Sequence, residues 1–280
     1  MTLHNHDALA AIRRELERWF VIDGPLARLP GGEGRTYRAD NVIYRRDPNV
    51  EENAFIVDLY RSIEQDGFRV PQPLQATSGV WTTPEGWTAW TFVSGQPAVP
   101  ADLAQVIPAL QAFHRALAQV ERPAYLDRRD SPYDRADRLA WSDAPTIDAR
   151  VAALISPLMQ RKREVSGLRA QLIHGDLNEQ NILVAPGMSP ALIDMTPYWR
   201  PPEFALAVLA FWIGSYRGSA EVLPLFAAIP AFDQMLIRMA LRTIFVSQEF
   251  ARLGIDVGDV EREYGPAVEI VCHWVDSRRT

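Results

Sequence analysis

Three oxygen-bearing side chains lie close together between residues 174 and 194. Asp176 and Asn181 are five residues apart in the polar stretch HGDLNEQN, Asp194 follows further along the chain, and each of the two segments comes after a short apolar run. Two adjacent strands would bring all three side chains to one edge of a small sheet. A carboxylate and an amide oxygen are hard ligands that suit magnesium, and a second carboxylate stays free to orient a hydroxyl group. Phosphoryl transfer requires such a combination.

The alternative interpretation is a polar turn between two core strands, in which each of these side chains caps nearby backbone. A buried aspartate at a strand end requires a partner. A shared metal ion explains three such residues better than three independent caps do. The sequence therefore favours a metal-dependent site at Asp176, Asn181 and Asp194, in which one carboxylate stays free to orient a hydroxyl group.

A glycine-rich stretch is the second candidate element of the site. Gly31, Gly32 and Gly34 precede a predicted pair of strands. Phosphoryl transfer needs backbone amides over the phosphates and a cation beneath them. Glycines between strands also commonly serve only as turn formers. Their position before the strand pair favours phosphate binding.

The cation is expected in the second of these strands. Arg45 is the first candidate and Arg46 the alternative. On the helix that follows, Glu52 is expected to orient the cation, with Glu51 as a close competitor. An ordinary surface charge is the alternative interpretation for both glutamates.

The stretch HGDLNEQNIL, followed by LIDM, resembles the catalytic and metal-binding loops of the aminoglycoside phosphotransferase family, relatives of the protein kinases. The resemblance implies that Asp176 is the catalytic base or orients the acceptor hydroxyl, and that His174 braces the loop. It implies that Asn181 binds Mg²⁺ and that Asp194 links the metal to the phosphates of ATP or GTP. LPGGEGRTYRADNVIYRR, GFRVPQP, GWTAW and PYWRPPEFA resemble an actinobacterial branch of the family.

The same resemblance bears on the nucleotide. The family usually has lysine where Arg45 aligns, and arginine keeps the charge but is longer and differs in geometry. The family holds the adenine base with backbone groups of the linker between lobes. Trp90 and Phe92 are therefore expected to line the adenine site, although packing in the N-terminal sheet is the alternative role for tryptophans in this region.

The elements that must position these residues indicate an α+β fold with two lobes, as in the protein kinases. Residues 1–92 are expected to form a nucleotide-binding lobe with a small antiparallel sheet. Residues 93–280 are expected to form a larger, mostly helical lobe for catalysis and acceptor binding, and the hinge lies at about 88–97. A tight turn is predicted at Asp40 and Asn41. Helices are predicted near 9–20, 51–65, 103–120, 149–159, 203–213, 221–229, 232–250 and 259–276; strands are predicted at 36–38, 42–45, 80–81 and 87–92, with two more between 170 and 194.

The acceptor is expected to be a small hydroxylated molecule. Only MTPYWRP separates Asp194 from the helix signal at Pro202, which leaves no room for the long activation segment of a protein kinase. An aminoglycoside-like, sugar or amino-alcohol acceptor is consistent with this. Tyr198, Trp199 and Arg200 would suit a flatter or partly anionic acceptor equally well. Acidic candidates for binding a polycation are Glu203, Asp233, Glu249, Asp256, Glu261 and Glu263.

Composition excludes several function classes. The formal net charge is −6 and no basic stretch is present, so a nucleic-acid partner is not expected. The single cysteine, Cys272, excludes an internal disulfide. The longest apolar run is too short to span a bilayer, so we expect no membrane partner and a cytoplasmic location. His114 lies among apolar residues at helical spacing and is expected to be packed and hydrogen-bonded.

A nucleotide-binding pseudokinase with a regulatory role is the alternative function. Arg45 in place of the usual lysine keeps this interpretation open, whereas the presence of Asp176, Asn181 and Asp194 argues for turnover.

Overall fold

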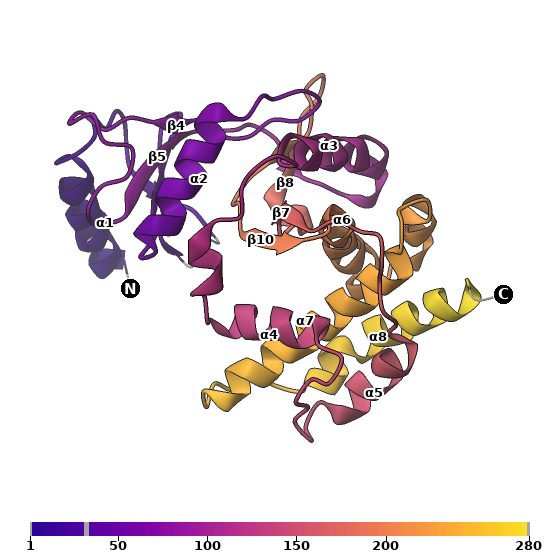
Figure 1. Cartoon of the computed structure of the whole chain (residues 1–280). Helices are drawn as coiled ribbons and strands as arrows, with labels where there is room; N and C mark the ends of the chain where they lie inside the picture. The colour runs from indigo at the N-terminus through magenta and orange to yellow at the C-terminus, as the bar shows by residue number, and fades with distance from the viewer. Residues whose placement is uncertain (1, 31–33, 279–280) are drawn as a thin grey trace. The chain divides into compact units, whose positions relative to one another are not determined.

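The computed structural model describes residues 2–30 and 34–278, shown in Figure 1. The chain divides into two compact units. The first takes in the chain up to Gln96 together with Leu183–Met195, and the second takes in Pro97–Ile182 and the chain from Thr196 onward. We call them the sheet unit and the helical unit. The sequence predicts that residues 93–280 form one lobe, whereas Leu183–Met195 belongs to the sheet unit. Among the described residues, no helix is long and apolar enough to cross a membrane.

The sheet unit contains a five-stranded antiparallel sheet. Its strand order is β1-β2-β3-β5-β4. These strands are β1 (Ala27–Arg28), β2 (Thr36–Ala39), β3 (Val42–Arg46), β4 (Pro73–Leu74) and β5 (Trp87–Thr91). Asp40 has a φ of 49°, the left-handed conformation that a tight turn needs between β2 and β3. The turn predicted at residues 40–41 is confirmed.

Two helices belong to the sheet unit, α1 (Thr2–Leu16) and α2 (Val50–Ser62). Aromatic and aliphatic side chains from the end of α1 and from the sheet form a buried core around Trp87, whose Nε1 donates to Glu15 at 2.9 Å. Helix α2 begins where the Asn49 side chain accepts a hydrogen bond from the Glu52 backbone amide at 3.2 Å. In Figure 1, α2 lies beside β4 and β5.

The helical unit is built along α7 (Phe232–Arg252), against which α4, α5, α6 and α8 pack (Figure 1). Most of α7 is buried, as expected of a central helix. The helices of the unit are α3 (Leu103–Ala116), α4 (Pro132–Trp141), α5 (Ala152–Arg161), α6 (Pro202–Ala210) and α8 (Val260–Ser277). Shorter turns are η2 (Pro100–Asp102), η3 (Ala124–Asp127), η4 (Glu179–Asn181) and η6 (Ala220–Phe226), and η5 (Phe211–Tyr216) is a π-helix that continues α6.

Short strands carry the predicted polar loops. β7 (Gln171–His174) pairs antiparallel with β10 (Pro197–Arg200), with Pro197 opposite His174. β6 (Gln96–Pro97), β8 (Ile182–Val184) and β9 (Ala191–Leu192) form a three-stranded ladder in the order β6-β8-β9, in the segments where the division between the units falls.

Two expectations were wrong. Residues 80–81 are not a strand, because the neighbour of β5 on that side is β4, and the chain turns at Gly79, whose amide bonds to the Ala76 carbonyl. The helix predicted to run to about residue 120 ends at Ala116. Helix α4 was not predicted, since its buried face consists of alanines and aspartates, without large apolar residues.

Candidate active site

The loop after β7 holds Asp176 and Asn181 in contact. The Asn181 amide nitrogen Nδ2 lies 3.1 Å from an Asp176 carboxylate oxygen and 2.7 Å from the Asp176 carbonyl oxygen. Asn178 Nδ2 donates another bond to the carboxylate at 3.3 Å. Because the Asn181 nitrogen makes both bonds, the oxygen of this amide is the atom that Asn181 can offer to a metal ion. Two neutral amides thus fix the orientation of the Asp176 carboxylate.

Two buried histidines support this loop. Nδ1 of His174 accepts a hydrogen bond from the Asp176 backbone amide at 3.2 Å. Nε2 of His114 in turn accepts from the His174 backbone amide at 3.4 Å, while its Nδ1 donates to the Leu110 carbonyl at 2.7 Å. Burial lowers the pKa of His114 to about 4, so the ring is neutral near pH 7. His114 is a packed, hydrogen-bonded residue, as predicted.

The residue before Asp176 is closely covered. A Cβ on Gly175 would lie 2.1 Å from Cδ2 of Tyr198, so the position requires glycine. Arg242 of α7 donates to the Gly175 carbonyl at 2.7 Å, and its guanidinium lies 4.5 Å from the Tyr198 ring centroid. Burial acts to lower the pKa of Arg242, but Tyr198, Asp137 and Asp176 raise it above the usual value. A charged, buried arginine therefore fixes the backbone next to Asp176.

In the sheet unit, Arg45 of β3 pairs with two carboxylates. It forms a close ion pair with Asp194, and its Nη2 lies 3.5 Å from Oδ2 of Asp47. Asp194 has a φ of 56°, which residues other than glycine rarely adopt. Residues held in such conformations are concentrated at functional sites. The side chains of Arg45 and Asp194 are about one-third exposed, so a ligand in solution can reach both.

The surroundings of Asp194 keep it in place. Arg69 donates to the carbonyls of Ser189 at 2.7 Å and Ser94 at 3.2 Å, and its own carbonyl accepts from the Leu192 amide at 2.8 Å. These bonds fix the segment that leads to Asp194. Burial, and then the Asp194 carboxylate, raise the pKa of Tyr60 well above its usual value, so this buried phenol stays neutral.

The predicted glycine-rich loop falls mostly outside the described residues. Gly31 and Gly32 lie outside them, and Gly34 lies within. Gly34 has a φ of 70°, a conformation that favours glycine. A Cβ there would lie 1.7 Å from Nη2 of Arg28, the end of a flexible side chain that can move away. The Gly34 carbonyl accepts a bond from Arg28 Nε at 2.9 Å. Phosphate binding by this loop stays a prediction.

Arg46 contacts different groups from Arg45. Its Nε donates to the Glu85 carbonyl at 3.2 Å, and its Nη1 lies 3.5 Å from the Glu15 carboxylate. Arg45, and not Arg46, is thus the cation that pairs with the predicted metal ligand. The sequence predicts that Glu52 orients the cation, but Arg45 forms ion pairs with Asp47 and Asp194. The Glu52 carboxylate accepts a bond from Asn49 in the cap of α2. An orienting role for Glu52 stays a prediction.

Trp90 and Phe92, the expected adenine-site residues, are packed in the sheet unit. Nε1 of the buried Trp90 donates to Thr88 at 2.8 Å, and its ring meets Tyr60 edge-on with 6.0 Å between centroids. The Arg38 guanidinium lies 3.5 Å from the centroid of the Phe92 ring. A contact of either residue with adenine stays a prediction.

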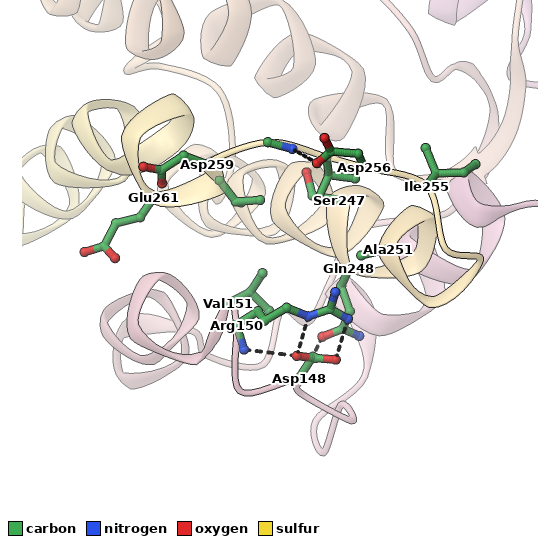
Figure 2. Close-up of a pocket in the computed structure, with 13 residues that line it drawn as sticks. Asp148, Arg150, Val151, Ser247, Gln248, Ala251, Ile255, Asp256, Asp259 and Glu261 are labelled. Carbon is green, nitrogen blue, oxygen red and sulfur yellow. Dashed lines mark hydrogen bonds and ion pairs between the residues drawn. The ribbon is translucent and has the colours of Figure 1, made fainter.

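The predicted site residues therefore form two groups, each within its own unit. Asp176, Asn181 and His174 belong to the helical unit, whereas Arg45 and Asp194 belong to the sheet unit. A cavity of about 320 Å³ at the C-terminal part of α7, which we call the large cavity, contains none of them in its wall (Figure 2).

Comparison with known families places these groups in context. Residues 26–232 match the phosphotransferase enzyme family, APH. This match spans well over half of the chain and includes both groups of site residues. The chain belongs to this family. The comparison with curated proteins gave no match.

Solved structures of this family's fold resemble the chain along nearly its whole length. An aminopropanol kinase associated with a microcompartment is 18% identical, with a TM-score of 0.68, and the match covers 96% of this chain and 97% of the other. Choline kinase LicA from Streptococcus pneumoniae is 14% identical, with a TM-score of 0.65 and coverage of 95% and 99%. Spectinomycin phosphotransferase is 15% identical, with a TM-score of 0.59 and coverage of 94% and 97%. The bilobal, kinase-like α+β fold is confirmed.

The sequence did not indicate every residue that positions the site of this phosphotransferase. Arg242 was missed, although it and Arg238 are the two arginines spaced four apart within the apolar part of α7. That spacing within a buried helix was an available signal, because arginine is rarely buried without a specific partner. Arg217, directly after the π-helix, pairs with Glu179 of the catalytic loop and had no sequence signal.

Proposed function

We propose that this phosphotransferase moves the γ-phosphoryl group of ATP or GTP to a hydroxyl group of a small acceptor. The observation that carries the proposal is the Asp176 carboxylate, held by the amides of Asn178 and Asn181 on a braced loop. A carboxylate in fixed orientation can accept a hydrogen bond from the acceptor hydroxyl and take its proton during transfer.

The length of the segment after Asp194 supports a small acceptor. Four of its residues form β10, which pairs with β7, and α6 begins at Pro202. This leaves no segment that could form a peptide-binding platform. The names of the neighbours in structure, an aminopropanol kinase, a choline kinase and a spectinomycin phosphotransferase, agree with a small acceptor.

The residues fit the magnesium ion that the family resemblance implies. Asn181 offers an amide oxygen and Asp194 a carboxylate, and magnesium prefers such hard oxygen ligands. We propose that these two residues hold the ion, which when bound neutralises charge on the phosphates. Arg45, which is paired with Asp194 here, would then be available to bind phosphate oxygens.

A nucleotide-binding pseudokinase is the second candidate, and Arg45 favours it, because arginine stands where the family usually has lysine and differs from it in length and geometry. The two candidates differ in turnover. Both predict that magnesium and ATP raise the melting temperature, since a ligand that binds only the folded state stabilises it.

The test is a screen of hydroxylated metabolites and antibiotics for release of ADP or GDP, with and without magnesium. The proposal expects magnesium-dependent release with at least one acceptor. Asp194→Ala should lose both turnover and at least tenfold in affinity for magnesium-ATP, equal to about 1.4 kcal/mol. Nucleotide binding without release for any acceptor would instead support the pseudokinase.

A further inference from the structure

A second cavity of the helical unit, of about 160 Å³, is lined by four arginines, and we call it the arginine cavity. The arginines are Arg122, Arg129, Arg138 and Arg200. Ligand pockets for drug-sized molecules begin at about 300 Å³, so this cavity suits only a small group of atoms. Three aspartates share the wall, so the formal charge of the lining is +1, in a chain whose formal net charge is −6.

The arginine cavity adjoins the catalytic loop. Tyr198 lines the cavity and packs directly against Gly175, the residue before Asp176. Arg129, on the cavity wall, donates to the Pro197 carbonyl at 2.6 Å, and its guanidinium lies 4.8 Å from the Tyr198 ring centroid. One aromatic ring therefore separates the cavity from the backbone that carries Asp176.

The three aspartates of the wall are already paired with arginines. Arg129 lies 2.9 Å from Asp134, and both side chains are largely buried. Arg200 binds Asp137 through Nε at 3.0 Å and Nη2 at 2.5 Å. The third aspartate, Asp127, pairs with Arg122. An ammonium group entering the cavity would therefore compete with an arginine for each carboxylate.

Positive charge also lies behind the wall. Arg242 contacts the same Tyr198 ring as Arg129, is buried, and has an Nε without a hydrogen-bond partner among the described residues. Arg138, at the exposed side of the cavity, pairs with Asp130, which lies outside the wall. A buried cation is costly unless a negative charge compensates it. Asp137 and Asp176 supply such charge to Arg242, and an anion in the cavity would add to it.

Two buried polar atoms of the wall lack a well-formed hydrogen bond. Oδ1 of Asp137 makes no hydrogen bond among the described residues, and the Tyr198 hydroxyl, which interacts with the buried Arg242, makes none of normal geometry there, although these residues are only 4% and 6% exposed. Buried polar groups are nearly always hydrogen-bonded in folded proteins. A hydroxyl group of a ligand can donate to Asp137 and accept from Tyr198. The cavity thus offers partners for an anion and for a hydroxyl group together.

We propose that the acceptor is a hydroxylated acid, and that the arginine cavity binds its carboxylate or phosphate group while another hydroxyl of the acceptor is phosphorylated. This proposal rests on the proposed function. It differs from an aminoglycoside or amino-alcohol acceptor in the sign of the charge that the site recognises.

The test uses matched sets of compounds that differ in charge. One set is glycerate, glycerol and 3-amino-1,2-propanediol; the other is gluconate, sorbitol and glucamine, with 3-phosphoglycerate added to separate phosphate from carboxylate. Release of ADP or GDP and calorimetric binding are measured for each. The acids should exceed the neutral and amine members at least tenfold, as expected for one charge-assisted hydrogen bond. A preference for the amines, or equal values across a set, would overturn the proposal.

Two variants of the arginine cavity test whether it is the site that binds the acid. Arg138→Glu and Arg122→Glu change partly exposed side chains, at 52% and 43% exposure, so the fold should be kept. Each should weaken acid binding at least tenfold and leave the thermal shift with magnesium-ATP unchanged. Arg150→Glu makes the same charge change in the large cavity and should have no effect.

The two proposals fail in different ways. If no compound of the broader screen gives ADP or GDP release, the proposed function fails, while calorimetry with the matched sets still decides the cavity. Acid binding that Arg138→Glu abolishes would support the arginine cavity, and absence of acid binding to the wild type would overturn it.

Discussion

Charged side chains near α7 make two kinds of contact. In the large cavity they bind groups close in sequence: Asp148 accepts bonds from the side chain and backbone of Arg150, and Asp256 accepts from the Gly258 amide (Figure 2). Near the catalytic loop they join residues far apart in the chain. Arg242 binds the carbonyl of Gly175, and Arg200 binds Asp137.

The difference indicates that cavity volume alone does not identify the candidate site of this protein. Aspartates in loops readily bind backbone amides two or three residues away, and such contacts need no assembled fold. Long-range contacts of buried charges exist only once the fold has formed, and they are costly unless well paired. By this criterion, the Arg242–Gly175 bond and the Arg200–Asp137 pair mark the assembled site beside the catalytic loop. The other arginine–aspartate pairs of the arginine cavity join residues close in sequence, as the charged contacts of the large cavity do.

Asp176→Asn should have the largest effect on turnover, and it distinguishes the catalytic loop from the large cavity most clearly. The substitution keeps the size but removes the charge that orients and deprotonates the acceptor hydroxyl. Turnover should fall by roughly 10²–10⁴-fold, with the loss in kcat and not in nucleotide affinity.

Asp256→Asn removes a carboxylate from the large cavity and is the matched control. It should change turnover less than twofold, because its amide oxygen can still accept the Gly258 bond. Equal losses in both variants, measured by ADP or GDP release with the best acceptor, would break the comparison.

Acid should destabilise the support of the catalytic loop and the wall of the large cavity in different pH windows. The pKa of His114 is lowered by burial from 6.5 to about 4, so the unfolded chain binds a proton that the folded one excludes. Stability from this residue is complete above pH 6.5 and is lost as the pH falls toward 4, by about 3 kcal/mol in all. The Arg150 guanidinium lowers the pKa of Asp148, so its contribution is lost only as the pH falls below 3.8.

Urea unfolding at several pH values between 7.5 and 4.5 checks this window. His114→Gln should be less stable than the wild type at neutral pH but show a smaller loss on acidification. If the variant and the wild type lose stability in parallel, another group is responsible and the assignment to His114 is wrong.

The sequence was informative where the structure depends on neighbours in the chain. HGDLNEQN predicted the loop in which Asn178 and Asn181 bind Asp176, and the turn at Asp40 followed from local turn preferences. Helix α4 was missed because its buried side includes Asp134 and Asp137, which are accommodated only by pairing with distant arginines.

The same limit explains why the sequence did not predict some contacts of the candidate site. The bond from Arg242 to Gly175 joins residues 67 positions apart, and no local pattern predicts it. Likewise, the pairing of Arg45 with Asp194 depends on how β3 and the segment after β9 meet, whereas helix spacing alone suggested Glu52. Residue types and order could be predicted from the sequence, but the choice among charged partners could not.

The smallest expected effect distinguishes two buried arginines one turn apart on α7. Arg242→Met removes the donor to the Gly175 carbonyl, and the raised pKa of Arg242 shows that its surroundings favour the charge. Loss of a buried hydrogen bond should reduce the free energy of unfolding by about 1–3 kcal/mol and lower kcat, because the backbone next to Asp176 is no longer fixed. Arg238 differs, since burial lowers its pKa and its bonds go to the carbonyls of Gln234 and Arg163, away from the catalytic loop. Arg238→Met should therefore cost less than about 1 kcal/mol and leave kcat unchanged, as replacement of a poorly compensated buried charge by an apolar side chain often does.

Urea denaturation and ADP or GDP release measure both variants. Arg242→Lys, which keeps the charge and a donor, should recover part of the lost kcat. If the two methionine variants behave alike, the bond of Arg242 to the catalytic loop matters no more for turnover than the bond of Arg238 to the Arg163 carbonyl.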